Sequence, residues 1–171
     1  MSVKITRETT GIAEQLYAAL NTVNDKRVGK VGWFEGSNYV DENGRTTPVA
    51  EVAAQNEFGN PSLNIPPRAT LRPTIAKRRT YWQKVAAKAT KDVLEGKAPN
   101  FDHVLELMGL VAASDFGDAI NQLSEPALRP ATIDARIRKQ KKGRILFGGI
   151  NKPLIESGIM LKTLTSIVED E

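Results

Sequence analysis

The segment "NEFGNPSLNIPPRATLRPTI", residues 56–75, decides the fold because it separates two helical patterns by a stiff connection. Gly59 stands where helices commonly end. Pro66 and Pro67 lack a backbone donor and hold the residues before them extended. The segment matches no nucleotide loop, metal site or membrane span. It therefore predicts an ordered connection between two helices that carries no catalytic residue.

Two arginines follow the prolines, and their spacing allows two interpretations. Arg68 and Arg72 are four residues apart, and each can form a bidentate pair with a carboxylate, for which Glu57 is a local candidate. One interpretation is an ordinary helix-to-helix connection. The other is a contact between subunits, because a preorganised extended segment loses little entropy on docking. The candidate interface residues are Glu57, Phe58, Ile65, Pro66, Pro67, Arg68, Leu71 and Arg72.

Helical periodicity extends to both sides of this segment. Apolar residues at three- and four-residue spacing predict helices over about residues 10–24, 48–58, 70–95, 101–124 and 131–139. Thr10, Thr47 and Thr70 are the expected N-caps, with Pro48 at the first helical position of its helix.

Strand signals appear near both ends of the chain. Residues 27–34, "RVGKVGWF", alternate in the manner of a strand, and Asn43-Gly44 marks a turn. The tail "MLKTLTSIVED", residues 160–170, fits either a helix or a strand, and we favour a strand paired with residues 27–34. The expected fold is α+β: one domain over 1–171, with several helices on a small antiparallel or mixed sheet and extended loops or an arm.

The composition argues against catalysis and secretion. The 171 residues include no Cys and one His, His103, so disulfides, thiolate chemistry and His-rich metal sites are excluded. Asp115 and Asp118 lie three apart on a predicted helix, and solvated helix surface is the favoured interpretation of both. The apolar runs are short and the first residues lack a signal-peptide pattern. We expect no enzyme activity, no cofactor or metal, no membrane contact, and use inside the cell that makes the protein.

A basic run stands out against the modest net charge of +4. We predict that residues 134–152 form a projecting basic loop or arm. In one interpretation, these basic side chains neutralise the phosphates of a nucleic acid. In the other, they dock on an acidic neighbouring protein or stay solvated. No aromatic residue interleaves the run, which does not favour base stacking. The candidate contacts to DNA or an acidic partner are Arg136, Arg138, Lys139, Lys141, Lys142 and Arg144.

Two blocks of the chain resemble the virion-morphogenesis family of tailed bacteriophages, which comprises tail-completion and neck proteins. The first lies within residues 28–75 and matches the family pattern at Val49, Ala50, Val52, Ala53, Asn56, Glu57, Phe58, Gly59, Ile65, Pro66, Pro67, Arg68, Leu71, Arg72 and Pro73. The second matches at Leu128, Pro130, Ala131, Thr132, Ile133, Arg136, Lys152, Pro153, Leu154, Ile155, Gly158, Met160 and Ile167. Their order and rough spacing agree across about residues 28–168.

Three features depart from the family pattern. Ala69-Thr70 stands where the family has Pro-Phe, so this chain has no aromatic residue at that position. Ser157 replaces a Thr before Gly158, and the link between the two blocks is longer than usual.

The resemblance implies a non-enzymatic virion component, assembled in the host cytoplasm and placed at the head–tail junction or tail end. Such proteins form rings, here expected to be hexameric, that contact neck, head-adaptor or tail-tube proteins. The alternative from the residues themselves is a nucleic-acid-binding accessory protein of phage assembly, with non-specific contact to packaged DNA.

Overall fold

The computed structural model describes residues 11–21, 23, 26–41 and 43–171. Within these residues it contains helices and two small antiparallel sheets, which confirms the α+β class. The elements in chain order are α1 (Gly11–Leu20), β1 (Arg27–Gly32), β2 (Asn38–Val40), β3 (Thr46–Pro48), α2 (Val49–Phe58), the 3-10 helix η1 (Pro61–Leu63), α3 (Leu71–Leu94), α4 (Phe101–Gln122), α5 (Pro130–Lys141), α6 (Ile159–Lys162) and β4 (Thr165–Asp170).

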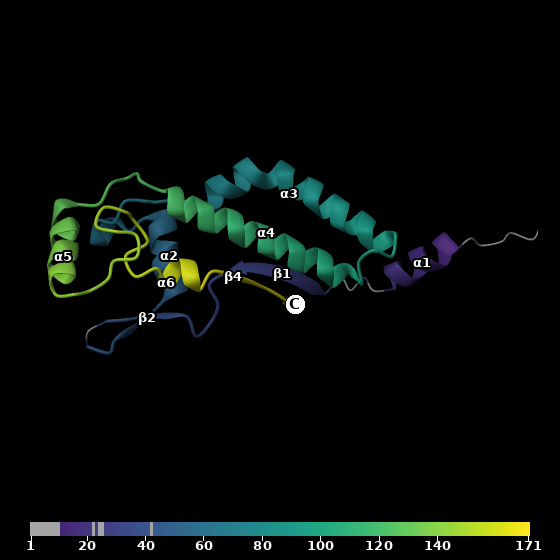
Figure 1. Ribbon diagram of the computed structural model, residues 1–171, viewed down its shortest axis with the longest axis horizontal. Helices are drawn as coiled ribbons and strands as arrows, with labels where there is room; N and C mark the ends of the chain where they lie inside the picture. Colours follow the sequence, from purple (N-terminus) through teal and green to yellow (C-terminus); the bar gives the residue numbers. More distant parts are fainter. Residues whose placement is uncertain (1–10, 22, 24–25, 42) are drawn as a thin grey trace, which may run out of the picture.

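A long helix, α4, is the centre of the molecule. It packs against α3 and against both strands of the β1–β4 pair, so it lies between the other long helix and this sheet (Figure 1). Asn100 starts α4 because its side-chain Oδ1 accepts a hydrogen bond from the backbone N–H of His103 at 3.1 Å. One salt bridge ties the helix to the sheet, since Arg27 of β1 donates to both carboxylate oxygens of Asp102 at 3.2 and 2.9 Å.

The predicted pairing of the tail with residues 27–34 is confirmed. Strand β4 runs antiparallel to β1, from Arg27 opposite Asp170 to Gly32 opposite Thr165. Helix α4 approaches this sheet closely at Gly109, where an added Cβ would lie 2.6 Å from the Cβ of Ser166. The glycine is therefore what allows helix and strand to touch.

The structure has a hydrophobic cluster at each end, and α4 contributes to both. Near α1, Ala89 and Val93 of α3 pack with Val104 of α4. At the opposite end, Val49 of α2 and Ile120 of α4 are completely buried. Figure 1 places α2, α5, α6 and the β2–β3 hairpin at this second end. Burying a side chain of this size contributes roughly 1.5–3 kcal/mol, so both clusters stabilise the arrangement.

The predicted helices over about 48–58, 70–95, 101–124 and 131–139 agree with the observed ones to within two residues at each end, whereas α1 ends at Leu20, short of the predicted 24, and the predicted cap at Thr47 is wrong. Thr47 belongs to β3, and Pro48 rather than Thr47 is the N-cap of α2. Thr70 does occupy the N-cap of α3, yet its side chain makes no capping hydrogen bond. The predicted cap at Thr10 lies outside the described residues.

Candidate functional site

The carboxylate of Glu57 caps helix α3 from a distance. It accepts hydrogen bonds from the backbone N–H groups of Thr70 at 2.7 Å, Leu71 at 3.0 Å and Arg72 at 3.0 Å. These are donors that the first turn of a helix cannot satisfy internally, and the negative charge complements the helix dipole. Glu57 reaches them because Gly59, with φ of +77°, turns the chain sharply after α2. A Cβ at Gly59 would lie 3.0 Å from Pro67, so a larger residue is excluded there.

Arg72 completes this arrangement from the first turn of α3. Its Nε donates to the carboxylate of Glu57 at 3.1 Å and its Nη2 donates to the backbone carbonyl of the same residue at 2.9 Å. Burial by itself raises the pKa of Glu57. The hydrogen bonds from the backbone of Arg72, Leu71 and Thr70 and from the Arg72 side chain outweigh it, and they hold the pKa below its usual value.

Arg68 is buried, and its partners are carbonyl groups. Nε donates to the carbonyl of Pro126 at 2.9 Å and Nη2 to that of Ala127 at 3.1 Å, which fixes the segment between α4 and α5. Burial and the nearby charges of Arg129 and Arg136 lower the pKa of the Arg68 guanidinium. The expected pairing with Glu57 therefore holds for Arg72 and is wrong for Arg68.

The eight candidate interface residues consequently divide into two groups. Glu57 and Arg68 are buried within the chain, and Ile65, Pro66 and Leu71 are half-buried. The exposed members are Phe58, Pro67 and Arg72. The Arg72 guanidinium lies over the exposed ring of Phe58, 4.7 Å from its centroid, as in a cation–π contact. Phe58, Pro67 and Arg72 therefore present the most surface to a partner.

The segment over 134–152, predicted as a projecting basic loop or arm, is partly helical, in agreement with the predicted helix over about 131–139. Helix α5 extends to Lys141, so the first half of that segment is helical. The chain then returns, with Phe147 donating its backbone N–H to the carbonyl of Glu156 at 2.8 Å and Gly148 donating to that of Ile155 at 2.8 Å. The segment is thus fastened to the chain that follows it.

Arg136 holds the chain after α5 in this position, so its side chain is not available to bind DNA. Its side chain is buried and its Nη1 donates to the carbonyls of Ile150 and Lys152 at 3.1 and 2.6 Å. Its Nε donates to Glu156 at 3.3 Å, and Lys139 donates to the other oxygen of that carboxylate at 2.6 Å. We therefore withdraw Arg136 as a candidate DNA contact. The candidates that stay exposed are Arg138, Lys141, Lys142 and Arg144.

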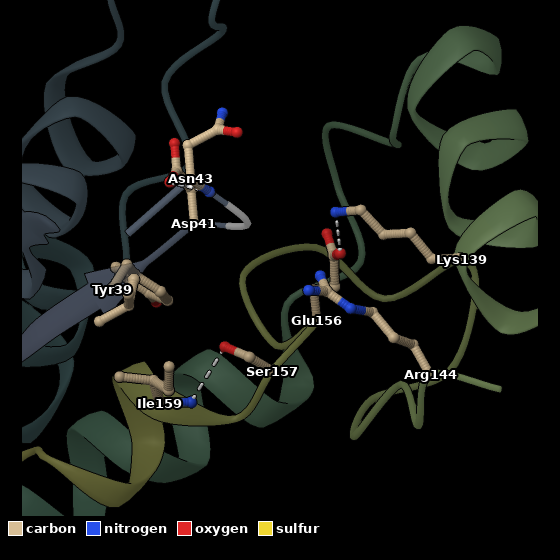
Figure 2. Close-up of a pocket in the computed structure, with 9 residues that line it drawn as sticks. Tyr39, Asp41, Asn43, Lys139, Arg144, Glu156, Ser157 and Ile159 are labelled. Carbon is tan, nitrogen blue, oxygen red and sulfur yellow. Dashed lines mark hydrogen bonds and ion pairs between the residues drawn. The ribbon is translucent and has the colours of Figure 1, made fainter. Parts of the chain in front are cut away.

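An open pocket of about 500 Å³ lies between the β2–β3 hairpin and the segment around α5 (Figure 2). Tyr39, Asp41 and Asn43 line it from the hairpin, and Lys139 and Glu156 line it from the opposite wall. Burial by itself raises the pKa of Glu156, but its contacts with Lys139 and Arg136 outweigh this and keep the carboxyl ionised at neutral pH. Its charge is thus already balanced inside the protein, which argues against a general base.

The remaining catalytic candidates are explained by packing. Asp115 is not simply solvated, because it accepts from Arg78 Nε at 2.9 Å and Trp82 Nε1 at 2.6 Å and so joins α4 to α3. Asp118 is exposed, as predicted. Ser157 Oγ accepts from the backbone of Ile159 at 3.4 Å (Figure 2). Across the described ranges, no group of three or more His, Cys, Asp or Glu side chains is placed to hold a metal ion.

Sequence reasoning missed Glu156 and wrongly interpreted Asp115 as solvated, and both residues organise this end of the molecule. Glu156 joins Arg136 and Lys139 although it lies 20 and 17 positions away. Asp115 binds α3 across 37 and 33 positions. The local sequence around each residue shows only a carboxylate, which does not identify the distant partner.

Apolar side chains are exposed at the same end of the molecule. Ile145 is 92% exposed and Phe147 is 57% exposed in the chain after α5, and Val40 is 64% exposed in the hairpin. Phe58 and Leu63 are also exposed. Exposed apolar residues that are scattered singly are normal on a protein surface and do not by themselves mark a contact with another protein.

The comparisons leave the family of this chain open. No protein-family model, curated protein or solved structure matches it. Within the described residues, every helix is too short or too polar to cross a membrane.

Proposed function

We propose that this chain is a structural virion protein of a tailed bacteriophage, a ring-forming subunit that acts in tail completion or head–tail joining. The resemblance of its two motif blocks to virion-morphogenesis proteins motivates the proposal. It assigns the chain to the neck or tail end of the particle, where it contacts copies of itself and neighbouring neck, head-adaptor or tail-tube proteins.

One observation carries most weight: the two motif blocks form a single structural unit. Val49 and Ala53 of the first block pack with Ile155 and Met160 of the second in one hydrophobic cluster. Arg68 of the first block holds the carbonyls of Pro126 and Ala127, directly before the second begins. Residues that match a family pattern in two separate stretches and then meet in space are what a shared fold requires.

The chemistry of the described residues also favours an interaction protein over an enzyme. The buried charges are satisfied within the chain, and the exposed features are scattered apolar side chains together with basic side chains. This combination suits assembly, because a rigid frame presents contacts at low entropic cost.

The test has two parts, one on the purified chain and one on the particle. Sedimentation and negative-stain microscopy should show closed rings, and a specific antibody should detect the chain in purified virions. A chain that stays monomeric at micromolar concentration and is absent from the particles would refute the proposal.

Nucleic-acid binding is a second candidate, and the solvent face of α3 favours it. Lys77, Lys84, Lys88 and Lys91 are exposed and lie at seven-, four- and three-residue spacing, which aligns them on one side of the helix. Such a stripe can neutralise phosphates. A gel-shift titration over a salt series decides this, since binding through the stripe must weaken steeply as salt rises, and replacing the four lysines with Gln must flatten that slope. Binding that is weak and insensitive to salt would eliminate the candidate.

A further inference from the structure

The β1–β4 sheet has two outer edges that no strand of the described residues covers. It contains two strands, and among the described residues neither strand pairs with a third. An isolated antiparallel pair is only marginally stable, and here α4 supports it from one face. The outer edges are therefore templates on which another strand can form hydrogen bonds.

The register shows which backbone groups face outward. The N–H of Glu171 donates to the carbonyl of Lys26 at 2.8 Å, which continues the β1–β4 register by one pair. Hydrogen-bonded and non-hydrogen-bonded pairs alternate along antiparallel strands. Val28 and Glu169 are therefore a hydrogen-bonded pair, whereas Gly29 of β1 and Val168 of β4 direct their N–H and C=O groups away from each other, toward the outer edges.

The edge of β4 is accessible from the side of α4. It borders a surface groove of about 290 Å³, lined by Glu106 and Leu110 of α4 and by Ser166, Ile167 and Val168 of β4. Leu110 is 64% exposed, so an apolar side chain stands beside the outward amides. An added strand would cover both.

Charge selects the strand that fits there. Strand β1 carries Arg27 and Lys30, and β4 carries Glu169 and Asp170. Within the chain the opposite signs already meet, because Lys30 pairs with Glu169 and Arg27 with Asp170. The β1 strand of a second copy would repeat this complementarity on the outer edge of β4, whereas a second β4 would bring acidic groups against acidic groups.

We propose that copies of this chain join head to tail, with the outer edge of β4 pairing antiparallel to the outer edge of β1 in the next copy. The two edges have equal length, six residues each, and differ from one another, so the contact is heterologous and generates a ring when the rotation closes. When the strands lie along the ring axis, strand pairs within one subunit alternate with strand pairs between subunits around the ring. The sheet then closes on itself, and every strand edge is paired. This inference rests on the proposed ring-forming function and specifies its interface.

Proline at an outward amide tests the pairing directly. Val168→Pro removes the N–H that faces the next copy but no hydrogen bond of the β1–β4 pair, a position where proline is tolerated on an edge strand. We expect sedimentation of the purified chain to show at least about a tenfold loss in self-association, from the lost hydrogen bond and the clash of the ring. Val168→Ala keeps the amide and is the matched control, which should associate like the unmodified chain.

Mixing two blocked variants gives the sharper result. Gly29→Pro blocks the β1 edge as Val168→Pro blocks the β4 edge, so each variant alone should be monomeric. Their equimolar mixture should form a heterodimer and nothing larger, because one intact edge of each kind remains. A homodimer of either variant, or rings that persist in both, would overturn the head-to-tail pairing.

A charge substitution covers the case in which a proline variant fails to fold. Both Leu110→Arg and Leu110→Glu remove the apolar side chain that the added strand would cover, but Leu110→Arg also places a positive charge beside an incoming basic β1, so it should weaken association more than Leu110→Glu. The exposure of Leu110 keeps both variants folded. Equal behaviour of the two would contradict the proposal. If rings form through another surface, the β4–β1 pairing is wrong but the proposed function is not. If rings form through β4 and β1 but are absent from virions, the proposed function is wrong but the pairing is not.

Discussion

Glu57 and Arg72 are joined twice over, since the carboxylate of Glu57 accepts from both the backbone N–H and the guanidinium Nε of Arg72. The same carboxylate accepts from Thr70 and Leu71, so one side chain from the end of α2 provides the cap of α3. The direction of the longest helix is thus set by a residue outside it.

Replacing Glu57 with Gln should destabilise the protein. The amide keeps one acceptor oxygen but turns an NH₂ group toward backbone donors, and it removes the charge that complements the helix dipole. We expect a loss of about 2 kcal/mol in the free energy of unfolding, measured by urea denaturation. Glu51→Gln is the control, because Glu51 is exposed on the same helix and contacts Gln55 at 3.1 Å. Equal losses for the two variants would contradict a capping role.

Acid should destabilise the protein in a defined direction. The pKa values of Glu57, Asp115 and Glu156 are all lowered in the folded state. The folded state therefore binds protons less readily than the unfolded chain, so these groups contribute full stability at pH values above their unfolded pKa. That contribution is lost as pH falls below the reference values of 4.5 for Glu and 3.8 for Asp and through the lower folded values.

Urea denaturation at a series of pH values measures this loss. Glu57→Gln should show a shallower fall in the free energy of unfolding than the unmodified chain, because one of the three groups no longer titrates. A fall of the same steepness in that variant would mean that Glu57 does not contribute.

Arg68→Ala should impair folding more than assembly. The guanidinium is buried and leaves two carbonyls without a donor when it is removed, which costs about 2 kcal/mol or more. The sequence alone made Arg68 a candidate interface residue, whose loss would impair assembly more than folding. Thermal unfolding of the monomer decides between them, with Arg79→Ala on the exposed side of α3 as the control. An unchanged midpoint for Arg68→Ala would restore the interface interpretation.

Two glycines of α4 should respond in opposite ways to alanine. At Gly109 the new Cβ would lie 2.6 Å from the Cβ of Ser166, so helix and strand must separate, and we expect a loss of about 1–3 kcal/mol. At Gly117 the nearest neighbour is Leu164 at 4.0 Å, and alanine should be neutral or stabilise by up to about 1 kcal/mol.

Calorimetry of the two single variants checks this contrast. Adding Ser166→Gly to Gly109→Ala should recover part of the loss, because it removes the carbon that the new methyl meets. Similar effects at both glycines would show that α4 does not touch β4 as described.

Local patterns predicted much of the fold, and distant contacts account for the errors. Helical periodicity placed α3 and α4 to within two residues of their observed ends, and alternation placed β1 opposite β4. The cap of α3 was assigned to Thr70, the nearest residue of suitable type, whereas the structure uses Glu57, 13 positions before it.

The basic run that begins within α5 shows the same limit of local sequence patterns. A run of basic residues reads as a solvated arm when only neighbours are considered. Arg136 is instead fixed by Glu156 and by the carbonyls of residues 150 and 152. These partners lie 14 to 20 positions further along the chain, so a local sequence pattern does not identify them. Charge patterns thus indicated which residues matter and not whether they face inward or outward.

The most direct measurement of the central claim is an averaged electron-microscopy map of the virion, supported by images of the purified chain. We expect density for this chain at the head–tail junction or tail end, as a closed ring whose subunits are joined by a sheet in which β4 of one copy lies beside β1 of the next. A particle map without the chain, together with a monomer in solution, would contradict it.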